Sequence, residues 1–381
     1  MKRDQFFNSA QSWSKRKHRL LGKYLVPFSS KVGSLTHEIY CVDGFAGRGQ
    51  YDDGYEGSPL VMARIADDCA KWTNPVTLRL LNVESNRKNF ASLSEVTQPW
   101  VTRGVVQNKK GQFGALVPNI LSIIGETPAL FFIDPYGPSP LHFDYLRPVL
   151  ERKQSITELI INFDVDGLRR LADDIRANTK TEVGRKACDT IVSLVTSILG
   201  RDRWKQFFVR DDLSSAQRQK FLLDDYMDSL SHYGYHVAAY PIRDALRSAA
   251  KYYLIYCTRH PDGIALMNRF VRSEEDQLLT ESFERKNQEW LIDPVEGEIQ
   301  LRRQELKILI LDYAEQKQKF TRGDIKGHFI FERFGDFSEP DYNAVVKGLM
   351  EGGALRTGDG RTRINDDVLL FYVAPQAGVL V

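Results

Sequence analysis

From His37 to Gly167 the chain alternates between short apolar runs and amphipathic stretches, and this alternation constrains the fold more than any other feature. The apolar runs predicted to be strands are "HEIYCVDGF", "VTLRLLNVES", "VTRGVVQN", "ALFFIDPYG" and "ITELIINFDVDG". Helical periodicity separates several of them, notably in "SPLVMARIADDCAKW" and "GQFGALVPNILSIIG". Strands that alternate with helices form a mainly parallel sheet with helices on both faces. The sequence therefore predicts an α/β fold.

Further elements flank this region. "SAQSWSKRKHRLLGKYLVPFSS" has the spacing of an amphipathic N-terminal helix, and residues 170–235 are rich in helical, charged stretches. "YHVAAYPIRD" and "KYYLIYCTRHPDG" read as two more strands, an antiparallel pair that closes the sheet. A helix is predicted to follow them.

Earlier in the chain, the helix predicted over "SPLVMARIADDCAKW" has Ser58 as its expected cap and Pro59 as its first helical residue.

The last eighty or so residues differ in pattern from the rest. "ERKNQEWLIDPVEGEIQ" is polar and reads as a linker region, and beyond it three predicted helices precede two strands joined by a polar hairpin. Three helices with a two-stranded wing are typical of a winged-helix domain. We therefore expect a large domain over 1–290, a linker over 291–300 and a winged helix over 301–381.

Composition excludes several classes of protein. The 381 residues carry 52 basic and 50 acidic side chains, a net charge of +2, which neither requires nor excludes nucleic acid as a partner. No apolar run is long enough to span a membrane and the start lacks a secretory segment, so we expect a cytoplasmic protein without a membrane partner. The four cysteines stand apart, without histidine pairs, so no metal site is expected.

The glycine-rich stretch "VDGFAGRGQYDDGYEGSPL" joins the first predicted strand to a helix. Its "FAGRG" is the F-x-G-x-G form typical of class I S-adenosylmethionine-dependent methyltransferases, with Phe45 at its start. Gly47 and Gly49 let the backbone approach the methionine part of the cofactor. Asp43 is placed to accept from the cofactor's amino group, directly or through water, and Glu84 from two ribose hydroxyls. The alternative is a tight structural turn beside a surface carboxylate.

The fourth predicted strand ends in "FFIDPYG", close to the [DNS]-P-P-[YFW] motif of amino-methyltransferases. In such a motif the acid, here Asp134, and the carbonyl of Pro135 accept hydrogen bonds from a planar amino group. Tyr136 would stack on a base that is flipped out or single-stranded. This chain has one proline where the motif has two, and Asp-Pro-Tyr-Gly is also ordinary turn chemistry.

Other candidates are less specific. Asn108, at the end of the third predicted strand, is a candidate for contact with the cofactor's adenine, although it could equally be loop material. The basic run "SKRKHRLLGK" could lie along a nucleic-acid backbone. The candidate phosphate contacts are Arg169, Arg170, Arg356, Arg361 and Arg363. For Arg169 and Arg170 the alternative is an ordinary solvated pair at the start of a helix. Protein docking by the C-terminal domain is an equal alternative to nucleic-acid reading.

Taken in order, "KHRLLGKYL", "YCVDGFAGRGQYDDGYEGSPLVM", "FFIDPYG", "IINFDVDGLRRL" and "YYLIYCTRHPDGIALM" resemble the prokaryotic three-Cys-motif partner protein family. The resemblance implies a Rossmann-like class I methyltransferase fold, similar to ribosomal-RNA adenine methyltransferases. It supports Asp43, Gly47, Gly49 and Glu84 as cofactor positions and 134–136 as the catalytic turn. It also implies a partner with a three-cysteine motif, of the radical S-adenosylmethionine type, which would carry the metal.

Three functions follow as hypotheses. The first is transfer of a methyl group from S-adenosylmethionine to an exocyclic amino group of a base in RNA or DNA. The second is a cofactor-binding, non-methylating subunit that delivers nucleic acid to a radical-type partner, in the processing of phage or mobile-element nucleic acid. The third is a winged-helix regulator with a vestigial enzyme fold.

Overall fold

In a computed structural model of the chain, the residues described are 9–177, 182–208, 210, 212–243, 248–250, 252–284, 293–358 and 360–374. The chain divides into two compact units, unit 1 over Met1–Ile264 and unit 2 over Ala265–Val381. Each is considered by itself. The boundary falls earlier than residue 290, within a helix that runs from Pro261 to Glu284.

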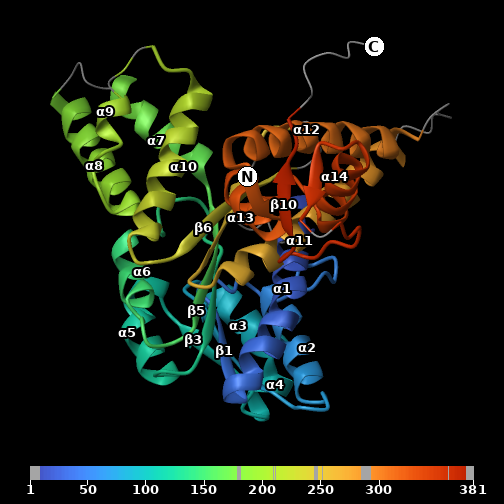
Figure 1. The fold of residues 1–381 in the computed structure, drawn as a ribbon. Helices are drawn as coiled ribbons and strands as arrows, with labels where there is room; N and C mark the ends of the chain where they lie inside the picture. Colours follow the sequence, from blue (N-terminus) through green and yellow to red (C-terminus); the bar gives the residue numbers. More distant parts are fainter. Residues whose placement is uncertain are drawn as a thin grey trace. The chain divides into compact units, whose positions relative to one another are not determined.

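The described residues of unit 1 build a seven-stranded sheet with the strand order β3-β2-β1-β4-β5-β7-β6 (Figure 1). The strands are β1 (Glu38–Asp43), β2 (Thr77–Glu84), β3 (Val106–Lys110), β4 (Ala129–Ile133), β5 (Thr157–Phe163), β6 (His236–Ile242) and β7 (Tyr252–Thr258). The first five pair in parallel, whereas β7 runs antiparallel to both β5 and β6. The predicted parallel sheet and its closing antiparallel pair are confirmed. The prediction for β3 began too early, because residues 98–102 form a short helix.

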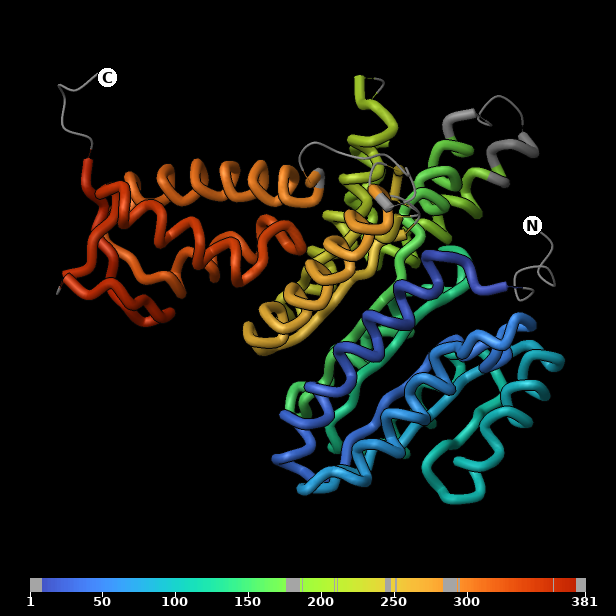
Figure 2. The backbone as a smooth tube through the Cα atoms, turned by 90° about the vertical axis from the view of Figure 1, so that its right-hand side faces the viewer, coloured from blue at the N-terminus to red at the C-terminus, as the bar shows by residue number. Residues whose placement is uncertain are grey.

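Helices cover both faces of the sheet. They are α1 (Ser12–Thr36), α2 (Ser58–Cys69), α3 (Arg87–Val96), α4 (Gln98–Thr102), α5 (Phe113–Ile124), α6 (Phe143–Leu150), α7 (Val165–Ala177), α8 (Glu182–Leu199), α9 (Lys205–Phe208) and α10 (Ser215–Ser231). Figure 2 shows α1 running alongside α2, which it contacts.

Successive residues of β1 show how the two faces are filled. Cys41 points to the face covered by α1 and α2, where its sulfur lies 3.1 Å from that of Met62 in α2. The next residue, Val42, belongs to the opposite core, which α5, α6, α7, α8 and α10 build with the sheet. Strand side chains alternate between faces, so a strand apolar at both positions is buried on both sides.

The start of α2 differs from the prediction. Its N-cap is Gly57, not Ser58, and Pro59 is the second helical residue. The Ser58 hydroxyl instead donates to the buried carboxylate of Asp43, at 2.6 Å. A side chain recruited by a distant buried acid is unavailable for capping, and only the tertiary contact reveals this.

Unit 2 contains helices and a small sheet around its own apolar core. Its elements are the greater part of α11 (Pro261–Glu284), α12 (Pro294–Lys317), β8 (Lys319–Thr321), α13 (Arg322–Glu332), α14 (Glu339–Glu351), β9 (Leu355–Thr357) and β10 (Leu369–Tyr372). Thr321 and Ser338 cap α13 and α14 with reciprocal capping boxes, as helix-start chemistry predicts.

Two expectations for this region need correction. The predicted linker over 291–300 is helical from Pro294, because Asp293 caps α12 and Pro294 suits its first turn; residues 291–292 lie outside the described residues. The sheet has a third strand, β8, which pairs antiparallel with the central β10. Three residues between two helices are too short to show a strand period.

The described helices include none long and apolar enough to cross a membrane.

Candidate functional site

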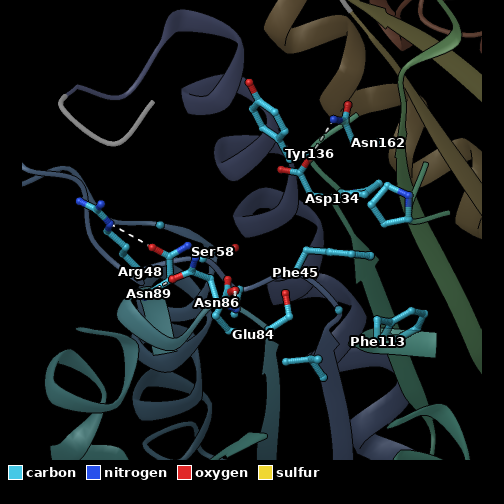
Figure 3. A pocket seen from close by; sticks show the side chains of 18 of the residues that line it. Phe45, Arg48, Ser58, Glu84, Asn86, Asn89, Phe113, Asp134, Tyr136 and Asn162 are labelled. Atoms are coloured by element: carbon cyan, nitrogen blue, oxygen red, sulfur yellow. Dashed lines mark hydrogen bonds between the residues drawn. The ribbon is translucent and has the colours of Figure 1, made fainter. Parts of the chain in front are cut away.

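A cavity of about 550 Å³ lies at the carboxyl ends of the parallel strands of unit 1. Residues that follow β1, β2, β3 and β4 line it, and so does Asn162 near the end of β5. Strand order reverses between β1 and β4, and the crevice outside such a switch point is where open α/β sheets bind ligands. Figure 3 shows Glu84, Asn86 and Asn89 in one part of the cavity and Asp134, Tyr136 and Asn162 in another.

The glycine loop after β1 forms one wall. Gly47 and Gly49 have positive φ angles of 63° and 81°, a conformation that residues with a side chain rarely adopt. A Cβ on Gly49 would also lie 2.7 Å from Val96. The loop is held by a hydrogen bond from the Gly57 amide to the Gly49 carbonyl, 2.8 Å. Phe45, Gly47 and Gly49 all line the cavity, so a ligand there meets bare backbone.

Asp43 does not line the cavity. It is fully buried beneath the loop, where its carboxylate accepts from the Ser58 hydroxyl at 2.6 Å and from the Phe45 amide at 3.0 Å. Burial raises the pKa of Asp43 to about 7, against the lowering effect of these two hydrogen bonds. Asp43, expected to accept from the cofactor's amino group directly or through water, therefore holds the glycine loop from its buried side.

This buried acid makes stability depend on pH. The folded protein keeps the Asp43 proton up to about pH 7, whereas the unfolded chain releases it near 3.8, so the free energy of unfolding falls as pH rises between these values. Asp43→Asn removes this contribution, which is at most about 4 kcal/mol. We expect urea unfolding to show a smaller loss of stability between acidic and neutral pH for this variant than for wild type. The exposed Asp52→Asn is the control, and equal pH profiles for wild type and Asp43→Asn would contradict the assignment.

Glu84 ends β2 with its carboxylate at the cavity wall. Its Oε1 accepts from the Asn86 amide at 2.6 Å, and burial raises its pKa while hydrogen bonds, first from Asn86 and then from Gly47 and Ser85, oppose the rise. Asn86 caps α3 by accepting from the Lys88 and Asn89 amides. The acid is thus oriented by the start of a helix, as an acceptor for hydroxyl groups needs to be.

Asp134 follows β4 and does not stand alone. Both carboxylate oxygens lie 2.7 Å from the ammonium nitrogen of Lys17 in α1, and Oδ1 also accepts from the Asn162 amide at 2.7 Å. The Lys17 side chain is 5% exposed and that of Asp134 18%. Sequence reasoning missed Lys17 and Asn162, because neither is near Asp134 along the chain.

The basic run "SKRKHRLLGK" could lie along a nucleic-acid backbone by its sequence, but three of its residues are not exposed for such a contact. Arg16, Lys17 and His18 are buried. The Arg16 guanidinium donates to the Arg243 carbonyl at 2.6 Å. His18 lines the cavity and stacks with Tyr55. Burial, and after it the nearby positive charge of Lys17, lowers the pKa of His18 to about 4. The apolar spacing of the helix places these polar residues on its inner face.

Aromatic side chains surround Asp134. Tyr136 is 51% exposed and lines the cavity together with Trp13, Tyr145 and Tyr252. The Lys17 ammonium lies over one of these rings, 5.3 Å from the centroid of Tyr252. Pro135 lies in the same wall, and Gly137 ends the turn with a φ of 77°. This part of the cavity offers flat apolar surfaces beside a paired acid, which suits a planar polar group.

Asn108 is not placed as expected. It lies within β3, where it accepts from Asn82 at 3.0 Å and donates to Thr97 at 2.8 Å, and it does not line the cavity. The strand runs two residues further than predicted, to Lys110. The residues that line the cavity after it include Gln112 and Phe113. The Phe113 ring packs on that of Phe45, with centroids 5.8 Å apart.

The candidate phosphate contacts fall into two groups. Arg169 in α7 forms ion pairs with Asp166 and Asp173. The Arg170 side chain is 66% exposed, and its Nε lies 3.5 Å from Oδ2 of Asp166. In unit 2, Arg356 is on β9 and Arg361 and Arg363 are in the loop before β10, and all three are exposed. The cavity does not include any of the five. Groups of side chains that could hold a metal ion are absent from the described residues.

The order β3-β2-β1-β4-β5-β7-β6 with an antiparallel β7 is the Rossmann-like arrangement of class I methyltransferases. No protein-family model and no curated protein matches the sequence. By its strand order, unit 1 has a methyltransferase-like fold, and its cavity lies at the carboxyl ends of the parallel strands, where open α/β sheets bind ligands.

Among solved structures, a protein from Legionella pneumophila is similar over 68% of this chain and 90% of its own, with 11% identity and a TM-score of 0.39. The O-methyltransferase TomG from Streptomyces achromogenes, in complex with SAM, covers 68% of this chain and 94% of its own, at 12% identity and a TM-score of 0.31. An O-methyltransferase from Bacillus cereus, in complex with SAH, covers 66% and 83%, at 10% identity and 0.31. Similarity at this level says nothing of substrate, which the site residues must indicate.

Proposed function

We propose that this chain is an S-adenosylmethionine-dependent methyltransferase that acts on an exocyclic amino group of a nucleic-acid base. One observation carries the proposal: a single cavity holds an acid suited to a ribose diol, Glu84, and a second acid suited to an amine, Asp134. The glycine loop forms the wall of the same cavity. Resemblance to the three-Cys-motif partner family supports the same conclusion.

The cofactor would supply an electrophilic methyl group, and residues of this chain would hold it. Glu84 accepts from the two ribose hydroxyls, with its carboxylate oriented by the Asn86 amide. The backbone at Gly47 and Gly49 takes the methionine part, since no side chain stands between it and the cavity. Gln112 and Phe113, at the mouth of β3, replace Asn108 as the residues for the adenine.

Asp134 and Pro135 act on the target amine. An amino nitrogen conjugated with a base is planar and a poor nucleophile. Hydrogen bonds from its N–H groups to the Asp134 carboxylate and the Pro135 carbonyl favour tetrahedral geometry, which frees the lone pair for the methyl group. The nitrogen that receives the methyl group would release one N–H proton to the Asp134 carboxylate, which passes it on to water. Asn162 and Lys17 keep the carboxylate in place.

The aromatic wall favours a base as the carrier of that amine. Tyr136 and Tyr252 present rings in the same part of the cavity as Asp134. Base faces stack on such rings only after leaving a duplex, so the substrate would be single-stranded or flipped.

The cofactor assignment is tested by calorimetric titration with S-adenosylmethionine. Glu84→Gln keeps an oxygen for the Asn86 amide but loses the charge that the hydroxyls bind. We expect affinity to fall about 10- to 100-fold, because hydrogen bonds to a charged group contribute about 1.5–3 kcal/mol. Glu95→Gln, on the exposed side of α3, should bind as wild type does. No binding by wild type, or equal binding by Glu84→Gln, would contradict the proposal.

A second function is favoured by the hydrogen bonds that Asp134 already accepts. Lys17 and Asn162 already occupy the oxygens of Asp134, and the turn has a single proline, so the acid could be structural. The chain would then bind S-adenosylmethionine without methylating and deliver nucleic acid to a radical-type partner with a three-cysteine motif. Cofactor binding without methyl transfer in a radiolabel screen over RNA and DNA, with co-purification of such a partner, would establish this instead.

For unit 2 we propose a winged-helix domain, with α12, α13 and α14 as its helices and β9 and β10 as its wing. Arg356, Arg361 and Arg363 are its candidate phosphate contacts. Helix α14 has a single basic side chain, Lys347, so it offers little positive charge to a major groove. We place the protein in the cytoplasm on the sequence evidence alone.

A further inference from the structure

The sheet of unit 2 carries a row of side chains directed away from its core. Phe371, on the central strand β10, pairs with Lys319 on β8 and with Arg356 on β9. Its neighbour Leu370 is fully buried in the core of the unit, so Phe371 lies on the opposite face. One cross-strand row therefore reads basic, aromatic, basic.

The Phe371 ring has a cation on one side and packs closely on backbone at one edge. The Lys319 ammonium lies 5.8 Å from the centroid of Phe371. A Cβ on Gly358 would come within 3.1 Å of the ring, which shows how closely one edge packs on that backbone. Phe371 is half-buried, so part of the ring remains accessible.

The charges of this face are available to a ligand. Lys319 and Arg356 are exposed, and neither forms an ion pair with any residue that the structure describes. The Thr357 hydroxyl donates to the Arg361 carbonyl at 2.9 Å, which ties the loop holding Arg361 and Arg363 to β9. The nearby Asp366 is already paired, with Arg322 at 2.7 Å and Lys326 at 2.8 Å.

We propose that this face, defined by Lys319, Arg356 and Phe371, binds single-stranded nucleic acid. One base stacks on Phe371, and its flanking phosphates contact Lys319 and Arg356. Basic grooves with aromatic platforms bind single strands in this way, and the ring of a base is covered in a duplex. That the ligand is a nucleic acid rests on the proposed function. That it is single-stranded, and that Lys319, Arg356 and Phe371 bind it, is inferred from the side chains of this face.

The test is fluorescence anisotropy with the full chain and a labelled single strand of about 16 nucleotides, as RNA and as DNA, beside the matching duplex. Phe371→Ala removes the ring, and Phe371→Leu keeps apolar packing without it. Phe331→Ala, at an exposed phenylalanine of α13, is the matched control. Lys319→Ala/Arg356→Ala tests the charges, with the exposed Lys347→Ala of α14 as its control.

We expect single-strand affinity to fall at least about fivefold in both Phe371 variants and to be unchanged in Phe331→Ala. In the double variant the slope of log affinity against log salt should shrink by about 1.4, or 0.7 for each lost phosphate contact. Equal affinity of wild type and Phe371→Leu, or tighter binding of duplex than of single strand, would overturn the proposal.

Titration of the same variants with S-adenosylmethionine separates this inference from the proposed function. Phe371→Leu should bind the cofactor as wild type does. Loss of single-strand binding alone in that variant supports the face. Failure of wild type to bind cofactor would refute the methyltransferase, whatever the anisotropy shows.

Discussion

Asp134→Asn is expected to lower methyl transfer about 10²- to 10⁴-fold, the range seen when a group that acts on a proton or developing charge is removed. The change is isosteric, but an amide has one acceptor oxygen and no charge. The target amine would therefore lose its partner in the transition state. S-adenosylmethionine affinity should stay within about twofold, because the acid faces the amine and not the ribose.

The measurement is single-turnover transfer of a labelled methyl group to the substrate that the RNA and DNA screen identifies. Asp144→Asn, an exposed acid of α6 paired only with Arg147 in the described structure, is the matched control. Full transfer by Asp134→Asn would show that this acid holds α1 and nothing more. The non-methylating alternative predicts that wild type and variant are equally inactive.

Asp134→Ala is expected to destabilise the protein by about 3–5 kcal/mol, because it leaves the Lys17 ammonium buried without its counterion. The Asn162 amide loses its acceptor as well. Lys17→Met should cost less, since the carboxylate left behind is the more exposed partner and Met fills similar space. Urea unfolding of Asp134→Ala, Lys17→Met and the double variant measures how far the two single losses of stability differ. The same series gives the coupling free energy between Lys17 and Asp134.

Lys71→Met is the control for this series. Lys71 forms an exposed pair with Asp68, so its removal should change stability by less than about 1 kcal/mol. If Asp134→Ala costs no more than this control, the pair in the cavity is solvated and does not hold α1 to the sheet.

The order of strands and helices could be predicted from the sequence because it depends on local periodicity. Apolar runs end at Asp43, Glu84 and Asp134, and in a parallel sheet such ends meet at one edge. The glycine loop could also be predicted, since Gly47 and Gly49 adopt the positive φ angles that favour glycine. Each of these signals is contained within a few neighbouring residues of the chain.

The tertiary structure alone decided which polar groups meet. Lys17 and Asp134 are 117 residues apart along the chain. Ser58 does not cap α2 as expected but donates a hydrogen bond to the buried Asp43. Asn108 turns to Thr97 and Asn82 within the sheet instead of entering the cavity. A buried polar group must find a partner wherever the fold brings one, because leaving it unpaired costs more than a local preference supplies. Local patterns therefore determined the scaffold of this protein, and long-range pairing determined the chemistry of its cavity.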